Sequence, residues 1–253
     1  RNGEKAMTKL ALVVGHTKSS PGATAAAPIN DSEYRWNKEL AEMMLAHAAG
    51  MAGVAAKVFQ RDGVGVAGAY RQAWEWGAEG SIELHFNAAG PSATGSETLY
   101  VTPLSLPLAE AVQDATLTVL GLRDRGVKTS LAASGGRGEQ NLMQMGGRPS
   151  ILTEPFFGSN PADATVARQQ KSALARAQLE AAVNVLVNID AEDHWTVRAS
   201  ALNVRGGPGA DYEKLSWGPL SQGTAVELIG RHDEWAFIRA EAGEGFVHAA
   251  FLS

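Results

Sequence analysis

Two histidines and two glutamates stand at the ends of short apolar segments or at the start of a segment with helical spacing: His16, Glu33, His85 and Glu154. Two imidazoles and one carboxylate form a zinc site that leaves one position open for water, as hydrolysis requires. A second carboxylate nearby can take a proton from that water and pass it to a leaving amine. These four residue types are therefore the ones that a metal-assisted hydrolysis needs.

Each of these residues also has a purely structural interpretation. A histidine that follows a strand, such as His16, is usually a hydrogen-bonded structural group, and Glu33 could complement the positive end of a helix dipole. Glu83 lies two positions before His85 on the same strand face, where it could orient the imidazole or form an ordinary buried pair. Glu154 precedes a proline, which restricts its backbone without assigning a role. Residue types and spacing alone leave both interpretations open.

Short apolar runs alternate along the chain with segments of helical spacing. The predicted strands cover residues 10–14, 54–59, 81–86, 96–101 and 151–153. The predicted helices cover residues 33–49, 67–78, 104–120 and 161–188, with a long glycine-rich loop over residues 121–150. This alternation indicates an α/β domain, a layered sheet flanked by helices. Ligands of such sheets bind beyond the carboxyl ends of the strands, where we expect the four residues to meet.

The sequence pattern changes after Asp190. Residues 195–253 contain short alternating β segments separated by glycine and proline turns, and no pattern of helical length. The β segments cover residues 201–204, 225–229, 235–239 and 245–247. We therefore expect two domains, one over residues 7–190 and a small all-β barrel over residues 195–253.

Composition excludes several classes of partner and site. The formal net charge is −5, from 22 basic and 27 acidic residues, and no lysine- and arginine-rich run indicates a nucleic-acid surface or a membrane anchor. No apolar stretch approaches the roughly 18 residues that span a bilayer, so we expect no membrane insertion. The chain has no cysteine, which excludes thiolate ligands and leaves histidine and carboxylate for any metal.

Five groups of residues occur in the order found in one enzyme family. They are Gly15-His16 with Pro21-Gly22-Ala23 and Glu33; residues 81–88, SIELHFNA; residues 95–100; residues 121–128; and residues 152–157 followed by 159–163. Over residues 9–189 the chain resembles the zinc-dependent N-acetylmuramoyl-L-alanine amidases of the amidase-3 type. Ordered agreement over five motifs is more specific than any single motif.

The resemblance implies a fold, a reaction and a role for each matching residue. His16, Glu33 and His85 match the family's zinc ligands, and Glu154 matches its catalytic glutamate. The implied fold is a mixed sheet flanked by helices, as in amidase-3 enzymes and zinc carboxypeptidases. The implied reaction is hydrolysis of the amide bond between N-acetylmuramic acid and L-alanine of the stem peptide, with Zn2+ as cofactor and peptidoglycan as partner.

Three further residues near these motifs are candidates for orienting a ligand or contacting substrate: Glu83, Asn87 and Arg71. The chain departs from the family at Val13-Val14, where an acidic residue is usual, and at Thr17-Lys18, where Gly-Gly is usual. Glu83 is a further departure, because it adds a charge to a strand that normally lacks one. These differences concern contacts around the ligands and not the ligands themselves.

The second domain resembles bacterial SH3-type domains over residues 196–252. The resemblance rests on residues 201–208, 223–228, 235 and 245–248. Such domains commonly bind cell-wall peptides, so we expect wall binding with Tyr212 and Trp217 as candidate contacts. Trp235 is expected in the core of this domain.

The start of the sequence bears on where the protein is made. Met7 is interpreted as the native start, with residues 1–6 an added remnant, and no signal peptide is recognised. We therefore expect a phage or prophage endolysin that is made in the cytoplasm of a bacterial host and acts at the cell wall or periplasm, with a secreted effector or a truncated export form of an autolysin as alternatives. The alternatives are another zinc amide hydrolase of the carboxypeptidase kind and a non-catalytic wall-binding protein, which the four intact site residues disfavour.

Overall fold

The computed structural model describes residues 7–129, 139–146, 148–189, 194–232 and 234–252. The chain divides into two compact units, one of Arg1–Val101 with Ser105–Leu186 and the other of Thr102–Leu104 with Val187–Ser253. Among the described residues, no helix combines the length and the apolar character that crossing a membrane requires.

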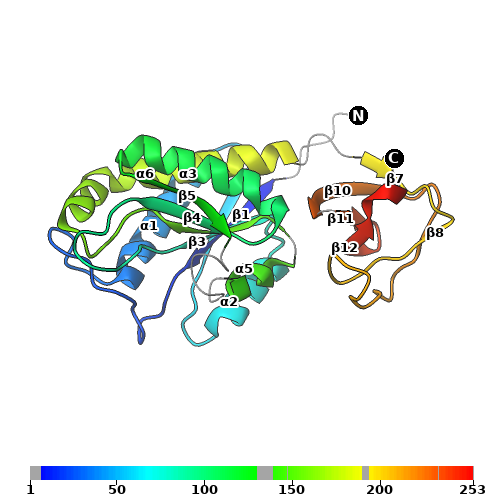
Figure 1. The fold of residues 1–253 in the computed structure, drawn as a ribbon, viewed down its shortest axis with the longest axis horizontal. Coiled ribbons are helices and arrows are strands. Elements are labelled where there is room, and N and C mark those ends of the chain that lie inside the picture. Colours follow the sequence, from blue (N-terminus) through cyan, green and yellow to red (C-terminus); the bar gives the residue numbers. More distant parts are fainter. Residues whose placement is uncertain (1–6, 130–138, 147, 190–193, 233, 253) are drawn as a thin grey trace. The chain divides into compact units, whose positions relative to one another are not determined.

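A six-stranded mixed sheet forms the centre of the first unit, in the order β2-β1-β3-β6-β4-β5 (Figure 1). The strands are β1 (Thr8–Val14), β2 (Val54–Phe59), β3 (Gly80–Leu84), β4 (Ser96–Tyr100), β5 (Asp124–Thr129) and β6 (Ser150–Glu154). Neighbours are parallel from β2 to β6, whereas β4 runs antiparallel to β6 and parallel to β5. Thus β4 and β5 begin at the edge where the other four strands end. The α/β fold class with a mixed sheet is confirmed.

Helices cover both faces of this sheet (Figure 1). They are α1 (Glu33–Ala48), α2 (Gly65–Glu75), α3 (Leu106–Leu120), α5 (Glu139–Leu142) and α6 (Pro161–Ile189), with 3-10 turns η1 (Pro103–Ser105) and η2 (Met143–Met145). α3 and α6 lie side by side on one face, and α2 and α5 lie on the other. α1 is joined to α6 by the ion pair between Lys171 and Glu39. The unit therefore has three layers with the sheet in the middle.

The apolar run in β1 is buried on both faces, as its pattern predicts. Residues 10–14 are fully inaccessible to solvent, and Ala11 and Val13 pack against Tyr70 of α2. Val13 pairs in register with Glu83 of β3, so the side chain of Glu83 also lies on the α2 face. This face carries the candidate site at the edge where β3 and β6 end.

One strand and one short helix lie where the sequence predicted only a glycine-rich loop. β5 and α5 both fall between residues 121 and 150. β5 reads DRGVKT and has no buried residue, because it is the outermost strand of the sheet. An edge strand with charged side chains lacks the apolar alternation that identifies a strand in a sequence.

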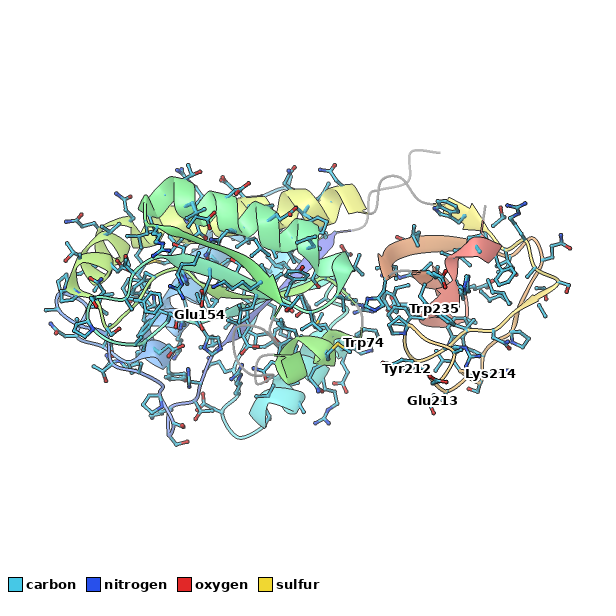
Figure 2. The ribbon with its side chains drawn as sticks, viewed as in Figure 1. Trp74, Glu154, Tyr212, Glu213, Lys214 and Trp235 are labelled. Carbon is cyan, nitrogen blue, oxygen red and sulfur yellow. The ribbon has the colours of Figure 1, made fainter. Side chains whose placement is uncertain are left out.

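The second unit is an all-β domain, as the sequence predicted. Its strands are β7 (His194–Thr196), β8 (Ala201–Leu202), β9 (Leu220–Ser221), β10 (Ala225–His232), β11 (Trp235–Ala240) and β12 (Gly243–His248), followed by η3 (Ala249–Phe251). Four form an antiparallel sheet, β12-β11-β10-β7, and β8 pairs with β9. Figure 2 shows Trp235 on the sheet and Tyr212, Glu213 and Lys214 on the long connection between β8 and β9. β7 and β9 were not predicted, because two or three residues carry no recognisable period.

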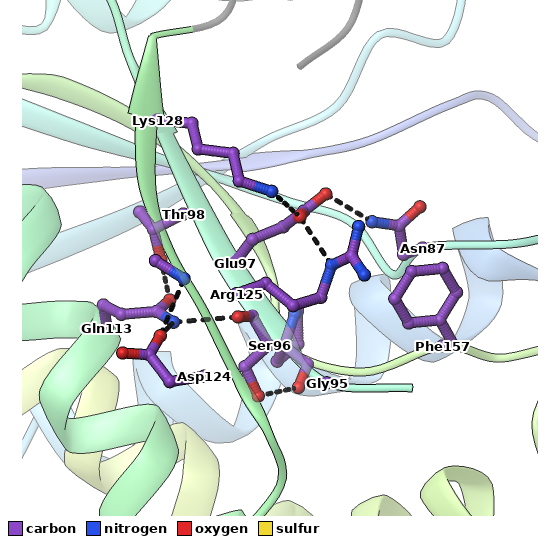
Figure 3. A network of polar contacts seen from close by, with 12 residues as sticks. Asn87, Gly95, Ser96, Glu97, Thr98, Gln113, Asp124, Arg125, Lys128 and Phe157 are labelled. Carbon is purple, nitrogen blue, oxygen red and sulfur yellow. Dashed lines mark hydrogen bonds and ion pairs between the residues drawn. The ribbon is translucent and has the colours of Figure 1, made fainter. Parts of the chain in front are cut away.

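A buried glutamine fixes β4 and β5 against α3 (Figure 3). The Oε1 atom of Gln113 accepts a hydrogen bond of 2.8 Å from the Thr98 hydroxyl. Its Nε2 atom donates to the carbonyl of Ser96 at 2.9 Å and to Oδ1 of Asp124 at 2.8 Å. One side chain thus holds the beginnings of two strands at the edge that carries the candidate site.

Gln113→Leu is expected to destabilise the fold by about 2–4 kcal/mol, because it leaves the buried Thr98 hydroxyl and the Ser96 carbonyl without partners. Chemical denaturation measures this change. Gln72→Leu, at an exposed position on α2, is the matched control and should change stability by less than about 0.5 kcal/mol. Equal stability of the two variants would contradict a structural role for Gln113.

Candidate active site

Three candidate ligands, which are far apart in the sequence, meet at one edge of the sheet. His16 follows β1, Glu33 begins α1 and His85 directly follows β3. His16 Nε2 lies 3.1 Å from Oε2 of Glu33, and His85 Nδ1 lies 2.7 Å from Oε1 of the same carboxylate. One ligand atom from each residue lies within 4.8 Å of the others, so the three could hold a metal ion. Two imidazole nitrogens and a carboxylate oxygen fit zinc with one position left open.

Two glycines make room for this cluster. A Cβ atom on Gly22, whose φ is +77°, would lie 2.7 Å from both Glu33 Oε2 and the His16 ring. A Cβ atom on Gly15 would lie 2.6 Å from the ring of His85. His16 itself has a φ of 65°, a left-handed conformation that non-glycine residues seldom adopt outside functional sites. The backbone is therefore shaped to bring the donor atoms together.

The carboxylate of Glu33 is held in its ionised form. Burial alone would raise its pKa, but hydrogen bonds and charges from His16 and His85 outweigh burial and lower the pKa to about 2. The Ser32 hydroxyl caps α1 by accepting a hydrogen bond from the Arg35 amide, which starts the helix one residue before Glu33. A charged oxygen donor is thus fixed at the first position of the helix.

Glu83 binds the opposite nitrogen of His85 and is completely buried. Its Oε1 atom lies 2.8 Å from His85 Nε2, forms an ion pair with Arg61 and accepts from Asn141 at 3.0 Å. Its Oε2 atom accepts a 2.5 Å hydrogen bond from the Tyr70 hydroxyl. A carboxylate on the far nitrogen of an imidazole fixes both the ring orientation and the nitrogen that faces the other ligands. Glu83 is placed to act on His85 in this way.

Glu154 ends β6 at the same edge as His85. Oε2 of its side chain is buried and has no hydrogen-bond partner among the described residues. Burial raises the pKa of Glu154 to about 8; the charge of His85 opposes this rise, and those of Glu33 and Glu97 add to it. A buried oxygen without a partner beside a set of metal donors can take and return a proton.

A fourth carboxylate, Glu97, lies opposite Glu154 and is surrounded by donors (Figure 3). Its Oε2 atom accepts from Arg125 Nε at 2.7 Å and from Lys128 Nζ at 2.6 Å, and its Oε1 atom accepts from Asn87 Nδ2 at 2.6 Å. Burial would raise the pKa of Glu97, but the bonds from Lys128 and Arg125 lower it. The candidate Asn87 thus contacts Glu97 rather than a metal donor.

The remaining candidates lie elsewhere. Arg71 is exposed on α2 and lines a separate cavity of about 290 Å³ with Trp74, Gln144 and Gly146. The cation that pairs with Glu83 is Arg61, which was not predicted from the sequence. Arg61 follows β2 at the same strand-end edge as the ligands, so its position could have identified it.

In the second unit, the two wall-binding candidates do not line the cavity described below. Trp217 is half-buried against the core, and Tyr212 is exposed beside Gly207. A cavity of about 360 Å³ is lined instead by Arg205, Trp235, His248 and Phe251, with small residues beside them. Trp235 packs against the core of the domain, as expected, and its half-buried ring also forms one wall of this cavity.

This fold and donor set are typical of metal-dependent amide hydrolases. Residues 10–184 match the family of N-acetylmuramoyl-L-alanine amidases, and residues 200–253 match the bacterial SH3 domain. The chain belongs to the N-acetylmuramoyl-L-alanine amidase family and carries a bacterial SH3 domain. The family expected from the sequence motifs is therefore confirmed.

Solved structures show the same fold. The catalytic domain of CwlV, an N-acetylmuramoyl-L-alanine amidase from Bacillus (Paenibacillus) polymyxa var. colistinus, is 19% identical with a TM-score of 0.61, covering 72% of this chain and 99% of that one. An amidase from Clostridium difficile 630 is 21% identical with a TM-score of 0.61, covering 75% and 100%. The catalytic domain of the CD27L endolysin, which targets Clostridia difficile, is 25% identical with a TM-score of 0.54, covering 70% and 97%. A search of curated proteins found no match.

The raised pKa of Glu154 predicts how the stability of metal-free protein depends on pH. The pKa is about 8 in the folded chain against an ordinary 4.5, so the folded state binds this proton more tightly. Its contribution to stability is complete below pH 4.5 and is lost as the pH rises through 8. Glu154→Gln removes this titration while keeping every histidine. The melting temperature of the chelator-treated variant should exceed that of the wild type by a margin that grows between about pH 5 and about pH 9. A constant margin would contradict the raised pKa.

Proposed function

We propose that the chain hydrolyses the amide bond between N-acetylmuramic acid and L-alanine of the peptidoglycan stem peptide at a zinc site, and that it acts as an endolysin. The observation that carries the reaction is the meeting of the His16, Glu33 and His85 donors beside Glu154, in a chain of the amidase family. The endolysin role is supported by the likeness to an endolysin catalytic domain.

His16, Glu33 and His85 would hold the metal. When bound, zinc supplies a Lewis acid that polarises the scissile carbonyl and makes a bound water more acidic. In the metal-free chain, hydrogen bonds and charge from the two imidazoles keep the pKa of Glu33 low, so its carboxylate is already ionised for metal binding. Glu83 keeps the Nδ1 atom of His85 turned toward the other two donors by binding Nε2.

Glu154 would move the proton. Its ionised carboxylate takes a proton from the attacking water, and its protonated form returns that proton to the nitrogen of the leaving L-alanine amine. Burial raises the pKa of Glu154 in the metal-free chain, which favours the protonated form that follows proton uptake. A carboxyl group with this property can act as base and acid in one turnover.

The SH3 domain would bind the wall through the cavity of about 360 Å³. Its rings are held as a continuous group, because His248 contacts both Trp235 and Phe251 at centroid distances of 5.6 and 5.5 Å. Arg205 supplies a cation 5.9 Å from the Trp235 ring. Aromatic walls with one cation suit a short peptide that has a carboxylate.

Exchange of the site residues separates metal binding from proton transfer. His85→Ala is expected to lose stoichiometric zinc and activity together, as measured by atomic absorption and by mass spectrometry of digested peptidoglycan. Glu154→Gln is expected to keep zinc and to lose about 10²–10⁴-fold in turnover, because the ligands remain while the proton carrier is gone. His47→Ala, a half-buried histidine in the last turn of α1, should change neither.

Full zinc content in His85→Ala would remove that residue from the ligand set. Peptide fragments cut elsewhere in the stem would indicate a peptidase instead.

Loss of the SH3 domain is expected to affect action on whole walls more than on small substrates. A chain of residues 7–190 should cleave soluble muropeptides at close to the full rate and intact sacculi more slowly, because the wall-bound domain raises local enzyme concentration. In the full chain, Phe251→Ala should reduce sedimentation with purified peptidoglycan, whereas Tyr212→Ala, outside the cavity, should not. If the short chain lyses sacculi as well as the whole chain, wall targeting is not the task of this domain.

A further inference from the structure

Glu97 has two cationic partners, Arg125 and Lys128, so these three residues together carry one unit of positive charge. Glu97 contributes one negative charge, whereas Arg125 and Lys128, which both bind its Oε2 atom, contribute two positive charges. Asn87 binds the other oxygen and adds no charge. Around a carboxylate that is already fully paired, the cluster retains one unit of positive charge.

The guanidinium of Arg125 is held in place while its outer nitrogens stay free. Its Nε atom donates to Glu97 at 2.7 Å, and its carbon lies 4.9 Å from the centre of the Phe157 ring. Neither Nη atom has a hydrogen-bond partner among the described residues. Figure 3 shows the group extending from β5 toward Asn87 and Phe157. A planar fork fixed at its base and on its face is preorganised for a carboxylate.

This fork adjoins the candidate active site through two short segments. Asn87 lies two residues after His85, and Phe157 lies three residues after Glu154. The two segments are paired with each other, since the Asn87 amide donates to the Phe156 carbonyl at 2.9 Å and the Gly158 amide donates to the Asn87 carbonyl at 2.8 Å. Glu97 pairs with Glu154 across strands that are about 4.8 Å apart. A group bound by Arg125 therefore lies within roughly one or two residues' length of the proton carrier.

We propose that Arg125, supported by Lys128 and Asn87, binds a carboxylate of the substrate next to the scissile amide; this rests on the proposed amidase function. In a stem peptide, the residue after L-alanine is a glutamate joined through its side chain, so its α-carboxyl group is free or amidated. One extended residue spans about 3.5 Å, which places this α-carboxyl within reach of the fork. Arg125 is then a binding residue that distinguishes a free carboxylate from a carboxamide.

Two soluble substrates that differ only at this group test the proposal: N-acetylmuramoyl-L-alanyl-D-glutamate with its α-carboxyl free, and the same compound as the α-amide. The wild-type enzyme is expected to favour the acid by about 10- to 100-fold in kcat/KM, because a charged hydrogen-bonded pair is lost with the amide. Arg125→Gln should lose this preference through a higher KM for the acid alone. Arg125→Lys should recover part of it. Arg123→Gln, an exposed arginine two residues earlier, should leave the preference unchanged.

A binding measurement separates this proposal from the amidase function. Calorimetry with the Glu154→Gln protein compares the affinities of the acid and the amide without turnover. Tighter binding of the acid that depends on Arg125 supports the proposal even if another bond proves to be the one cleaved. Equal kcat/KM values for the two substrates in the wild type would overturn it, as would a preference that survives Arg125→Gln in a variant with unchanged zinc content and melting temperature. Absence of cleavage of either substrate would count against the amidase function instead.

Discussion

The Glu33 carboxylate is the contact on which the candidate site depends. Its two oxygens bind one imidazole each, and those imidazoles come from the ends of two adjacent parallel strands. The carboxylate can do this only because a serine cap starts the helix at the right residue and because glycines leave space on both sides. This bridge keeps the two imidazoles and the carboxylate at contact distance.

Around this bridge, acidic and basic side chains follow one another in contact. Glu33 lies between two histidines, Glu83 lies behind one of them, and Arg61 lies behind Glu83. A buried carboxylate such as Glu83 is costly unless it is paired and hydrogen-bonded, and here both oxygens are fully occupied. Glu154 is the exception, since one of its oxygens is buried and unpaired. In this cluster Glu33, Glu83 and Glu97 are paired, whereas Glu154, the proposed proton carrier, keeps one oxygen without a partner among the described residues.

The sequence predicts the central elements well because their signals are local. The apolar run of β1 and the long helical pattern of α6 are recognisable from their own residues. Because ligands bind where parallel strands end, His16, His85 and Glu154 are expected at one edge of the sheet. The contacts of Glu83 are not predictable in the same way. Tyr70, Arg61 and Asn141 come from three separate segments and meet only because α2 and α5 cover the same face of the sheet. β5 was not predicted for a related reason. Its residues lie at an exposed edge, and two of them bind Glu97, so none shows the apolar pattern of a core strand.

The length of the connection between β3 and β4 is not fixed by the pairing of β4, which runs antiparallel to β6. Asp163 accepts hydrogen bonds from Thr94, Gly95 and Phe157, so both the start of β4 and the segment after Glu154 are tied to the first turn of α6. Residues 90–92 lie between Ala89, whose amide donates to the Ser159 hydroxyl, and Thr94, and they are exposed. Because the register of β4 is set beyond them, the connection can lengthen or shorten there without moving Glu97 across from Glu154. An insertion in this short stretch would therefore change the surface at the rim of the candidate site while Glu97 stays opposite Glu154.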